Sequence, residues 1–170
     1  LATKGIDAQA TYDFDVGSYG SVRVDYAATY LDSLATTPFP GADPIECAGK
    51  FAGGCGAPNS EYRHRGLVNW DTPWDVRFTA AWRYYSATDN DAGSDVQPEI
   101  DRDIGTVQYF DISADYRFSD TLSFKAGINN ILGERTPVIT SSGPPLGNGN
   151  TYPTVFDTGR YIFLGATYRL

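Results

Sequence analysis

The feature that most constrains this chain is a strict two-residue alternation of apolar and polar side chains, which recurs seven times. Two residues is the period of a β-strand, because successive side chains of a strand point to opposite faces. No segment of comparable length has helical spacing. The sequence therefore predicts an all-β fold, an antiparallel up-and-down meander of about seven long strands. The alternating segments are residues 5–15, 21–31, 61–71, 75–87, 106–118, 121–132 and 159–170.

Charged residues separate by face in these segments. The apolar faces of the first six segments contain no Asp, Glu, Lys or Arg. A soluble antiparallel sheet packed on a core would alternate in this way, and so would a transmembrane β-barrel with a polar lumen. The alternation alone leaves both alternatives open. The charged side chains of the polar faces are Asp7, Asp13, Asp15, Arg23, Asp25, Arg63, Arg65, Asp71, Arg77, Arg83, Asp111, Asp115, Arg117, Lys125 and Arg169.

Three further features favour the barrel. The segments span about 10–13 residues, which fits a tilted membrane-crossing strand better than the roughly 5–6 residues usual in globular proteins. Aromatic residues gather toward both ends of the segments around an aliphatic middle, as in the aromatic girdles of barrels in lipid. Short connections also alternate with long ones, which is typical of outer-membrane barrels. The short connections are residues 16–20, 72–74 and 119–120, and the long ones are residues 32–60, 88–105 and 133–158.

The net charge and the number of strands further restrict the class of protein. The formal net charge of -8 argues against nucleic acid as a partner, because phosphate binding needs clustered Lys and Arg. No apolar run approaches the roughly 18 residues of a membrane helix. An open seven-stranded sheet would leave unpaired backbone groups in hydrocarbon, and bacterial single-chain barrels have an even number of strands. We therefore expect the chain to be a fragment of a longer protein.

Sequence patterns in the C-terminal part point to a family. Residues 129–137 read NNILGERTP, residues 150–161 read NTYPTVFDTGRY, and residues 162–170 alternate as a terminal strand. These segments resemble the end of the penultimate strand, the last loop and the final strand of TonB-dependent outer-membrane receptors. The run Trp82, Arg83 and Tyr84, and the cysteine-bearing loop before Tyr62, are also similar to that family.

The resemblance carries several expectations about the whole protein. Residues 1–170 would be the C-terminal portion of a roughly 22-stranded barrel in a Gram-negative outer membrane, with the plug domain and earlier strands outside this chain. The protein would be a monomeric receptor for TonB-energised uptake of an iron–siderophore, cobalamin or carbohydrate. Its partners would be the lipid bilayer, its own plug, the TonB system, the barrel-assembly machinery and a small-molecule or oligosaccharide ligand. The alternatives are a passive porin-like or structural barrel and a secreted soluble β-sheet binding module.

The final strand also resembles the signal that barrel-assembly machinery reads. The family usually ends in Phe or another aromatic residue, whereas this chain ends in Leu. The alternating pattern of the signal is nevertheless kept. Its residues are Ile162, Leu164, Ala166, Tyr168 and Leu170.

Cys47 and Cys55 are the only cysteines, and both lie in the longest loop. On an extracellular face they are expected to form a disulfide that holds the loop in shape. The alternatives are two free thiols or a metal pair. Metal is disfavoured, because no His or third Cys lies nearby in the sequence.

The polar face supplies two groups of candidate site residues. Charges in mid-barrel or near the short turns are expected to pair across strands and to contact the plug. Residues near the long loops are better candidates for ligand contact. The first group is Asp111, Asp115, Arg117, Lys125 and Arg169, and the second is Arg63, Arg83, Tyr85, Tyr109 and Tyr161, with the loop aromatics Phe39, Phe51, Tyr152 and Phe156.

Catalytic, cofactor and metal sites have little support in the sequence. The single histidine, His64, falls on the apolar face, where no nucleophile and base can be assembled around it. The acidic loop 88–105 resembles a calcium loop, but its Gly93 comes one position early and the closing Glu is missing. Solvated loop charge is the expected role, with a weak divalent-ion site as the alternative. No enzyme activity and no cofactor are predicted.

Overall fold

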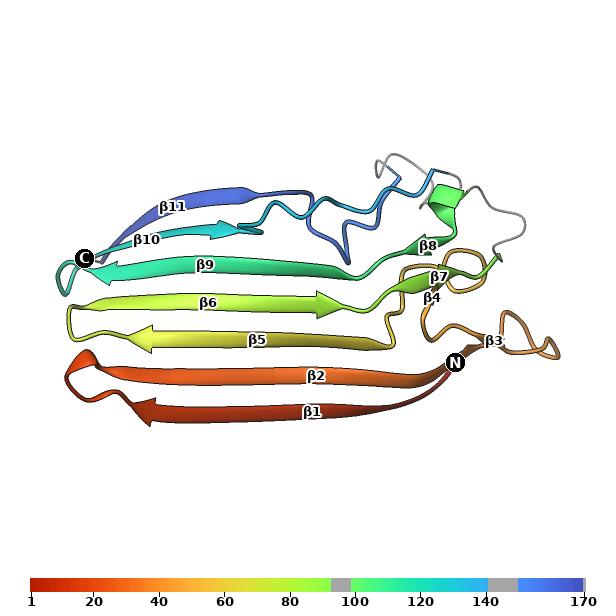
Figure 1. The fold of residues 1–170 in the computed structure, drawn as a ribbon, viewed down its shortest axis with the longest axis horizontal. Coiled ribbons are helices and arrows are strands. Elements are labelled where there is room, and N and C mark those ends of the chain that lie inside the picture. Colours follow the sequence, from red (N-terminus) through yellow and green to blue (C-terminus); the bar gives the residue numbers. More distant parts are fainter. Residues whose placement is uncertain (93–98, 141–149, 170) are drawn as a thin grey trace.

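The computed structural model describes residues 1–92, 99–140 and 150–169 and shows an open antiparallel β-sheet (Figure 1). Its long strands are β1 (Ala2–Asp15), β2 (Ser21–Thr36), β5 (Tyr62–Asp71), β6 (Val76–Tyr85), β9 (Val107–Arg117), β10 (Leu122–Asn129) and β11 (Tyr161–Tyr168). They lie side by side in chain order, and every neighbouring pair is antiparallel. The predicted fold class, an all-β meander of seven long strands, is confirmed.

Several strand ends differ from the predicted limits by a few residues, and two of these differences have clear local reasons. β10 stops at Asn129, earlier than the alternation suggests, because Asn130 has a φ of 53° and therefore leaves the extended conformation. β2 runs further than predicted, to Thr36, because its last residues pair with the start of β1 and with the short strand β3 (Ile45–Glu46).

The pairing register keeps the two faces of the sheet separate. Gly66 on β5 pairs with Trp82 on β6, and Trp82 pairs with Phe110 on β9, all on the apolar face. In the adjacent row, on the charged face, Arg65 is opposite Arg83. A slip of one residue would move every apolar side chain to the charged face, so the register is strongly specified.

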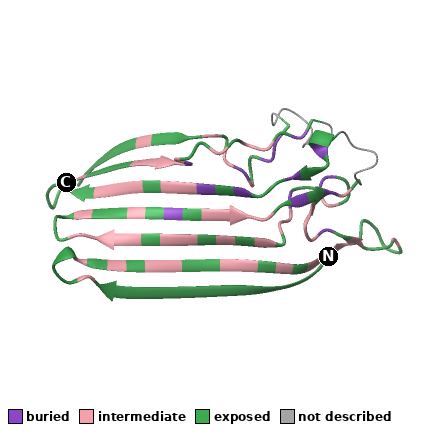
Figure 2. Ribbon diagram, viewed as in Figure 1, coloured by how far each residue is buried: buried purple, intermediate pink, exposed green. Residues whose placement is uncertain are grey.

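The apolar face is open to its surroundings in the described residues. The side chains of Ile112 and Leu164 are 44% and 82% exposed. A soluble antiparallel sheet buries such a face against a core, whereas a barrel wall presents it to lipid. Figure 2 shows the same contrast, because the long strands are mostly exposed or intermediate and most of the buried residues gather at one end.

The connections sort by length onto the two ends of the sheet. The three-residue 3-10 turn η1 (Gly17–Tyr19) and two tight turns join strands at one end, called here the short-turn end. The long connections 37–61, 86–106 and 130–160 lie at the opposite end (Figure 1). Their described parts are called here the loop cap. No helix in the described residues is long and apolar enough to cross a membrane.

The loop cap contains regular structure that the sequence does not predict. The strands β4 (Lys50–Phe51), β7 (Thr88–Asn90) and β8 (Asp103–Ile104) form a separate three-stranded sheet, and the 3-10 turn η2 (Glu99–Asp101) precedes β8. Strands of two or three residues are too short to show a period in the sequence. A hydrophobic core binds the cap together; its buried members are Phe51, Ala52, Ile104, Val107, Tyr109, Ile139, Tyr152 and Phe156.

Candidate functional site

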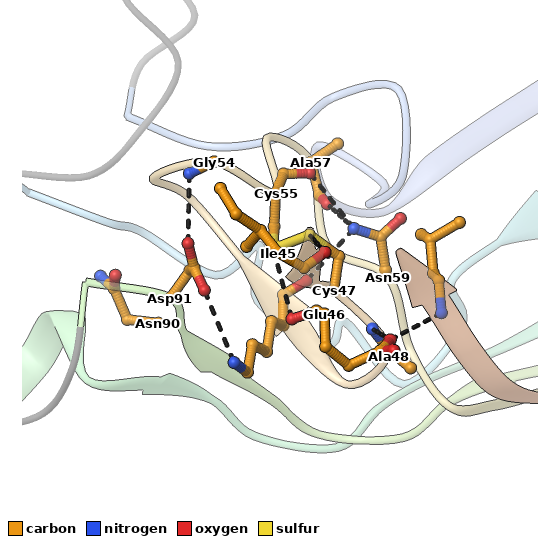
Figure 3. Close-up of a disulfide and its surroundings, with 12 residues drawn as sticks. Ile45, Glu46, Cys47, Ala48, Gly54, Cys55, Ala57, Asn59, Asn90 and Asp91 are labelled. Carbon is orange, nitrogen blue, oxygen red and sulfur yellow. Dashed lines mark hydrogen bonds and ion pairs between the residues drawn. A yellow bond between two sulfur atoms is a disulfide. The ribbon is translucent and has the colours of Figure 1, made fainter. Parts of the chain in front are cut away.

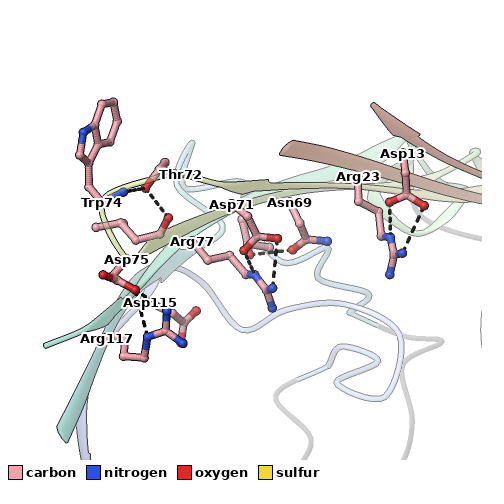
Figure 4. Close-up of polar contacts among 12 residues, drawn as sticks. Asp13, Arg23, Asn69, Asp71, Thr72, Trp74, Asp75, Arg77, Asp115 and Arg117 are labelled. Carbon is pink, nitrogen blue, oxygen red and sulfur yellow. Dashed lines mark hydrogen bonds and ion pairs between the residues drawn. The ribbon is translucent and has the colours of Figure 1, made fainter. Parts of the chain in front are cut away.

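In the short-turn half of the charged face, two arginines form ion pairs with aspartates on the neighbouring strand. Arg23 on β2 lies 2.6 Å from Asp13 on β1, and Arg77 on β6 lies 2.6 Å from Asp71 on β5. In both pairs two guanidinium nitrogens donate to the two oxygens of one carboxylate. Figure 4 shows these arginines projecting from the same face of the sheet. In such bidentate pairs, two hydrogen bonds fix the guanidinium against the carboxylate, and the opposite charges of the two groups offset each other.

The charges expected to pair across strands have different surroundings. Lys125 on β10 lies 3.6 Å from Asp115 on β9. Arg117 donates from Nε to Asp75 at 3.0 Å, and Asp75 belongs to the tight turn before β6 (Figure 4). Arg169, just beyond β11, forms no ion pair in the described part of the chain.

Arg83 fastens the last long loop to the sheet. Its guanidinium lies 3.0 Å from Asp111 on the neighbouring strand β9 and 2.6 Å from Asp157 in loop 130–160. The same guanidinium lies over the ring of Tyr109, 4.9 Å from its centroid. The backbone N–H of Asp157 donates to the Tyr109 hydroxyl at 3.1 Å. One arginine therefore holds both a strand and a loop.

The two C-terminal sequence patterns meet at this arginine. Asn130 is fully buried, and its backbone N–H donates to Asp111 at 2.7 Å. Its side-chain amide donates to the Glu134 carbonyl and accepts the Glu134 N–H, which closes a tight loop. Thr136 donates from its hydroxyl to the Asp157 carbonyl at 2.5 Å. Segments 129–137 and 150–161 thus form one hydrogen-bonded unit. Sequence spacing alone does not predict this arrangement.

Four aromatic rings that the sequence puts forward for ligand contact lie instead in the loop core. Phe51 and Tyr109 have no exposed surface, and Tyr152 and Phe156 are also buried. Phe51 contacts Tyr152 edge-on, with the ring centroids 6.3 Å apart. Burial raises the pKa of Tyr152 above its usual value. Long loops in water need a core of their own, which is why these rings turn inward.

The remaining candidates for ligand contact lie on accessible surface. Phe39 is exposed in the first long connection. Arg63 and Tyr85 line hollows on the charged face, and Tyr161 lines another. These residues keep the exposure that ligand contact requires.

Cys47 and Cys55 form the predicted disulfide (Figure 3). On one side of it, Glu46 accepts hydrogen bonds from the Ser33 hydroxyl at 2.6 Å and from the Leu34 N–H at 2.6 Å. These bonds, with another from Ala48, lower the Glu46 pKa to about 2. The disulfide loop is thereby joined to the end of β2.

On its other side, the disulfide loop contacts the acidic loop. Asp91 accepts the Gly54 N–H at 3.2 Å and lies 3.5 Å from the Lys50 ammonium (Figure 3). Asp101 is buried and accepts both the N–H and the hydroxyl of Thr140. These carboxylates therefore join loops to each other. The described residues contain no cluster of metal-binding side chains, and Gly93 and Asp95 lie outside them.

His64 lies on the apolar face, as its parity predicts. Its ring stacks on Tyr84 at 5.1 Å and meets Trp82 edge-on at 4.3 Å. Tyr26 and Tyr62 complete the surrounding aromatic group. Neither ring nitrogen has a hydrogen-bond partner among the described residues, and the ring is packed within this aromatic group.

Three adjoining hollows lie on the charged face toward the loop cap. The arginine hollow has a volume of about 340 Å³, and the loop hollow, of about 380 Å³, is bounded by residues from two long connections. Arg63 and Tyr85 line both of these. The wall hollow, of about 680 Å³, shares Arg65 and Arg83 with the arginine hollow. Together they form a polar, partly basic surface with aromatic sides.

The sheet is open, with one exposed apolar face, one charged face and a loop cap at one end. These features define a segment of a β-barrel wall. A family model for the TonB-dependent receptor-like β-barrel matches residues 2–131. The chain belongs to this family, which is one of receptors and transporters rather than enzymes and whose barrels reside in the outer membrane. A search of curated proteins found no match.

Solved structures show the same fold. The chain is similar to the ferric enterobactin receptor of Pseudomonas aeruginosa, in a mutant bound to enterobactin, with 15% identity and a TM-score of 0.66. A double mutant and a complex with BCV-L6 of the same receptor match with 16% identity and TM-scores of 0.65 and 0.64. In each case the match covers 98% of this chain and 22% of the receptor. The chain thus spans about a fifth of the length of these structures.

Proposed function

We propose that this chain is the C-terminal part of the barrel of an outer-membrane receptor, which takes up a scarce ligand with energy from the TonB system. The charged face lines the lumen, and the apolar face contacts lipid. The short-turn end faces the periplasm and the loop cap faces the outside. The family assignment supports this proposal, and the opposite character of the two faces is the observation that carries it.

The open edges of the sheet support a larger barrel. β1 and β11 each have one long strand as neighbour among the described residues. In hydrocarbon, unpaired backbone groups along such edges would each cost several kcal/mol. We propose that earlier strands of the same monomeric protein pair with these edges, and that its N-terminal plug fills the lumen and contacts the paired charges.

The last strand fits the role of an assembly signal. Ile162, Leu164, Ala166 and Tyr168 alternate along β11 and share the parity of the apolar face. All four are exposed. Leu170, the last residue of the signal, lies outside the described residues. We propose that the barrel-assembly machinery reads this face of β11.

An iron–siderophore is the ligand class we place first. The support is that the similar structures are those of a ferric enterobactin receptor. Cobalamin and carbohydrates are the other ligand classes of this proposal, because the described surface has both basic and aromatic side chains.

Uptake by the intact receptor that contains this chain tests the proposal. The receptor is expressed in a Gram-negative strain that lacks its own siderophore receptors, with and without a functional TonB. We expect saturable uptake of at least one ligand from a panel of iron–siderophores, cobalamin and oligosaccharides, lost without TonB. Non-saturable uptake that ignores TonB would instead identify a passive pore. Recovery of the receptor in buffer without detergent would identify a soluble binding module.

A further inference from the structure

The last pair of long strands, β10 and β11, is joined differently from the other pairs. In the part of the chain that the structure describes, no side chain of β11 forms a hydrogen bond or an ion pair. Every other neighbouring pair of long strands has at least one polar bond between side chains. These bonds are Thr11 to Asp25, Tyr26 to Tyr62, Arg77 to Asp71, Arg83 to Asp111, and Lys125 to Asp115.

Neither the connection nor the alternation fixes the pairing of these two strands. A tight turn sets the register of a hairpin, but β10 and β11 are joined by the long connection 130–160. The ion pair of Asp157 holds this connection, and residues 158–160 still lie between that point and β11. The alternation excludes a slip of one residue, because such a slip would exchange the two faces. A slip of two residues would leave every side chain on its own face.

Phe163 distinguishes the observed register, because its ring covers Gly127. The two residues are direct cross-strand partners on the charged face, and every residue of β11 except Phe163 is exposed. A methyl group added to Gly127 would overlap the Cζ atom of Phe163. It would also lie 2.7 Å from the Ile112 carbonyl oxygen and 2.7 Å from the Cβ atom of Ser113. The ring therefore occupies space that only a glycine leaves open.

A register displaced by two residues would lose this contact. Phe163 would then lie opposite Lys125 or Asn129, whose side chains take up the space that the ring fills above Gly127. Apolar surface of the ring that is now covered would return to water, which is unfavourable. In the observed register Tyr161 also stacks on Phe163, with the ring centroids 6.2 Å apart. The contact between ring and glycine is thus specific for one pairing of the two strands.

We propose that Phe163, seated on Gly127, is a register lock, which fixes how the last strand pairs with the strand before it. An aromatic ring over a glycine is one of the devices that pin strand register in a sheet. The consequence extends beyond these two strands, because strand stagger and barrel size are linked when a sheet closes. A displaced β11 would present its outer edge out of step to the rest of the wall. The lock goes beyond the proposed function, since it holds for any ligand.

Cross-linking of engineered cysteines in the intact receptor measures the register. The two native cysteines already form a disulfide with each other. Thr167→Cys is combined with Ser123→Cys to report the observed register. It is combined with Thr121→Cys or Lys125→Cys to report the two registers displaced by two residues. Each pair is oxidised briefly in isolated outer membranes, and mass spectrometry of the linked peptides gives the yields.

The register is compared in four variants of the receptor, Phe163→Ala, Phe163→Tyr, Gly127→Ala and Gly165→Ala. Gly165 is the matched control for Gly127, because it lies on the same face of the same two strands and a methyl group there would meet no atom within 4 Å. Phe163→Tyr keeps the ring, whereas Phe163→Ala removes it without creating any overlap. If Gly127→Ala prevents assembly of the barrel, Phe163→Ala alone decides the result.

We expect Phe163→Ala and Gly127→Ala to raise the displaced cross-links roughly three- to tenfold relative to the observed one. Phe163→Tyr and Gly165→Ala should match the receptor without these changes.

Several results would overturn the lock. One is an unchanged ratio of cross-links in Phe163→Ala, and another is an equal rise in Gly165→Ala. A lower melting temperature of Phe163→Ala with only the observed cross-link would show that the ring stabilises the wall without fixing its register. Failure of the Ser123 and Thr167 pair to cross-link in the receptor without these changes would show that the register itself is wrong.

Discussion

In the strands, large apolar side chains such as Ile162 and Leu164 lie exposed along one face, whereas in the loop cap Phe51 and Phe156 are buried among other loop residues. The strands need no protein core on that face, because lipid covers it in the proposed barrel. The loops project into water and need a core, a disulfide and ion pairs of their own. One chain therefore combines two packing schemes, which should respond differently to the same kind of substitution.

The largest difference is expected for removal of a phenylalanine ring. Phe51→Ala should destabilise the loop cap by roughly 3–5 kcal/mol, because the ring is fully buried and its loss leaves a cavity. Phe118→Ala, at an exposed position beyond β9, should leave the cap unchanged. Hydrogen exchange of cap amides in the intact receptor measures both. Equal protection of the cap in the two variants would contradict a separate loop core.

A new arginine should destabilise the barrel much more on the apolar face than on the charged face. Ala114→Arg, on the apolar face of β9, should destabilise the barrel by roughly 2–4 kcal/mol, because the guanidinium would enter hydrocarbon. Ser113→Arg, one residue earlier and on the charged face, should cost much less. Urea unfolding of the receptor in lipid vesicles gives both values. Similar costs for the two variants would show that the assigned register is wrong.

The disulfide should stabilise the cap without affecting the wall. Replacing Cys47 and Cys55 by Ser should lower cap stability by roughly 2–3 kcal/mol, the entropy expected for a closed loop of this size. Limited proteolysis of the first long connection reports the change, and the urea midpoint of the strands should not move. A shift of both together would mean that cap and wall unfold as one unit.

Asp157 should hold loop 130–160 against the sheet through its ion pair with Arg83. Asp157→Asn removes one of the two acidic partners of Arg83 and should cost roughly 1–2 kcal/mol, since both side chains are partly buried. Asp13→Asn breaks an exposed pair with Arg23 and should cost less. Protease cleavage within loop 130–160 should increase in the first variant alone. No increase would show that the loop core suffices to hold this loop.

The smallest effect is a pH dependence of the disulfide loop. The pKa of Glu46 is lowered from 4.5 to about 2, so its contribution to stability is complete above the unfolded value and is lost as the pH falls toward 2. Glu46→Gln should reduce the melting temperature of the cap at neutral pH. The difference from the wild type should shrink as the pH falls below about 4.5. A difference that persists at the lowest pH would exclude the carboxylate as its cause.

The long strands could be predicted from the sequence because each repeats the two-residue period over many positions. The disulfide could be predicted because its two cysteines are near each other and alone in the chain. Parity also placed Arg83 and Asp111 on one face, and the structure joins them.

The loop cap could not be predicted in the same way. Its strands have two or three residues, and its core brings together residues as distant in sequence as Phe51 and Tyr152. Loop aromatics on their own are compatible with ligand contact and with packing. The ion pair of Arg83 with Asp157, far apart in the chain, likewise depends on tertiary structure. The only available signal was the presence of several large rings in connections rich in Gly and Pro.

Solvent mapping along β9 tests the membrane orientation most directly. Single cysteines replace Phe110, Asp111, Ile112, Ser113 and Ala114 in the intact receptor in lipid vesicles, and each carries a spin label. We predict that labels at the even positions relax with oxygen dissolved in lipid and that labels at the odd positions relax with a water-soluble nickel complex. The reverse alternation, or the same response at all five positions, would contradict a wall with lipid on one side and an aqueous lumen on the other.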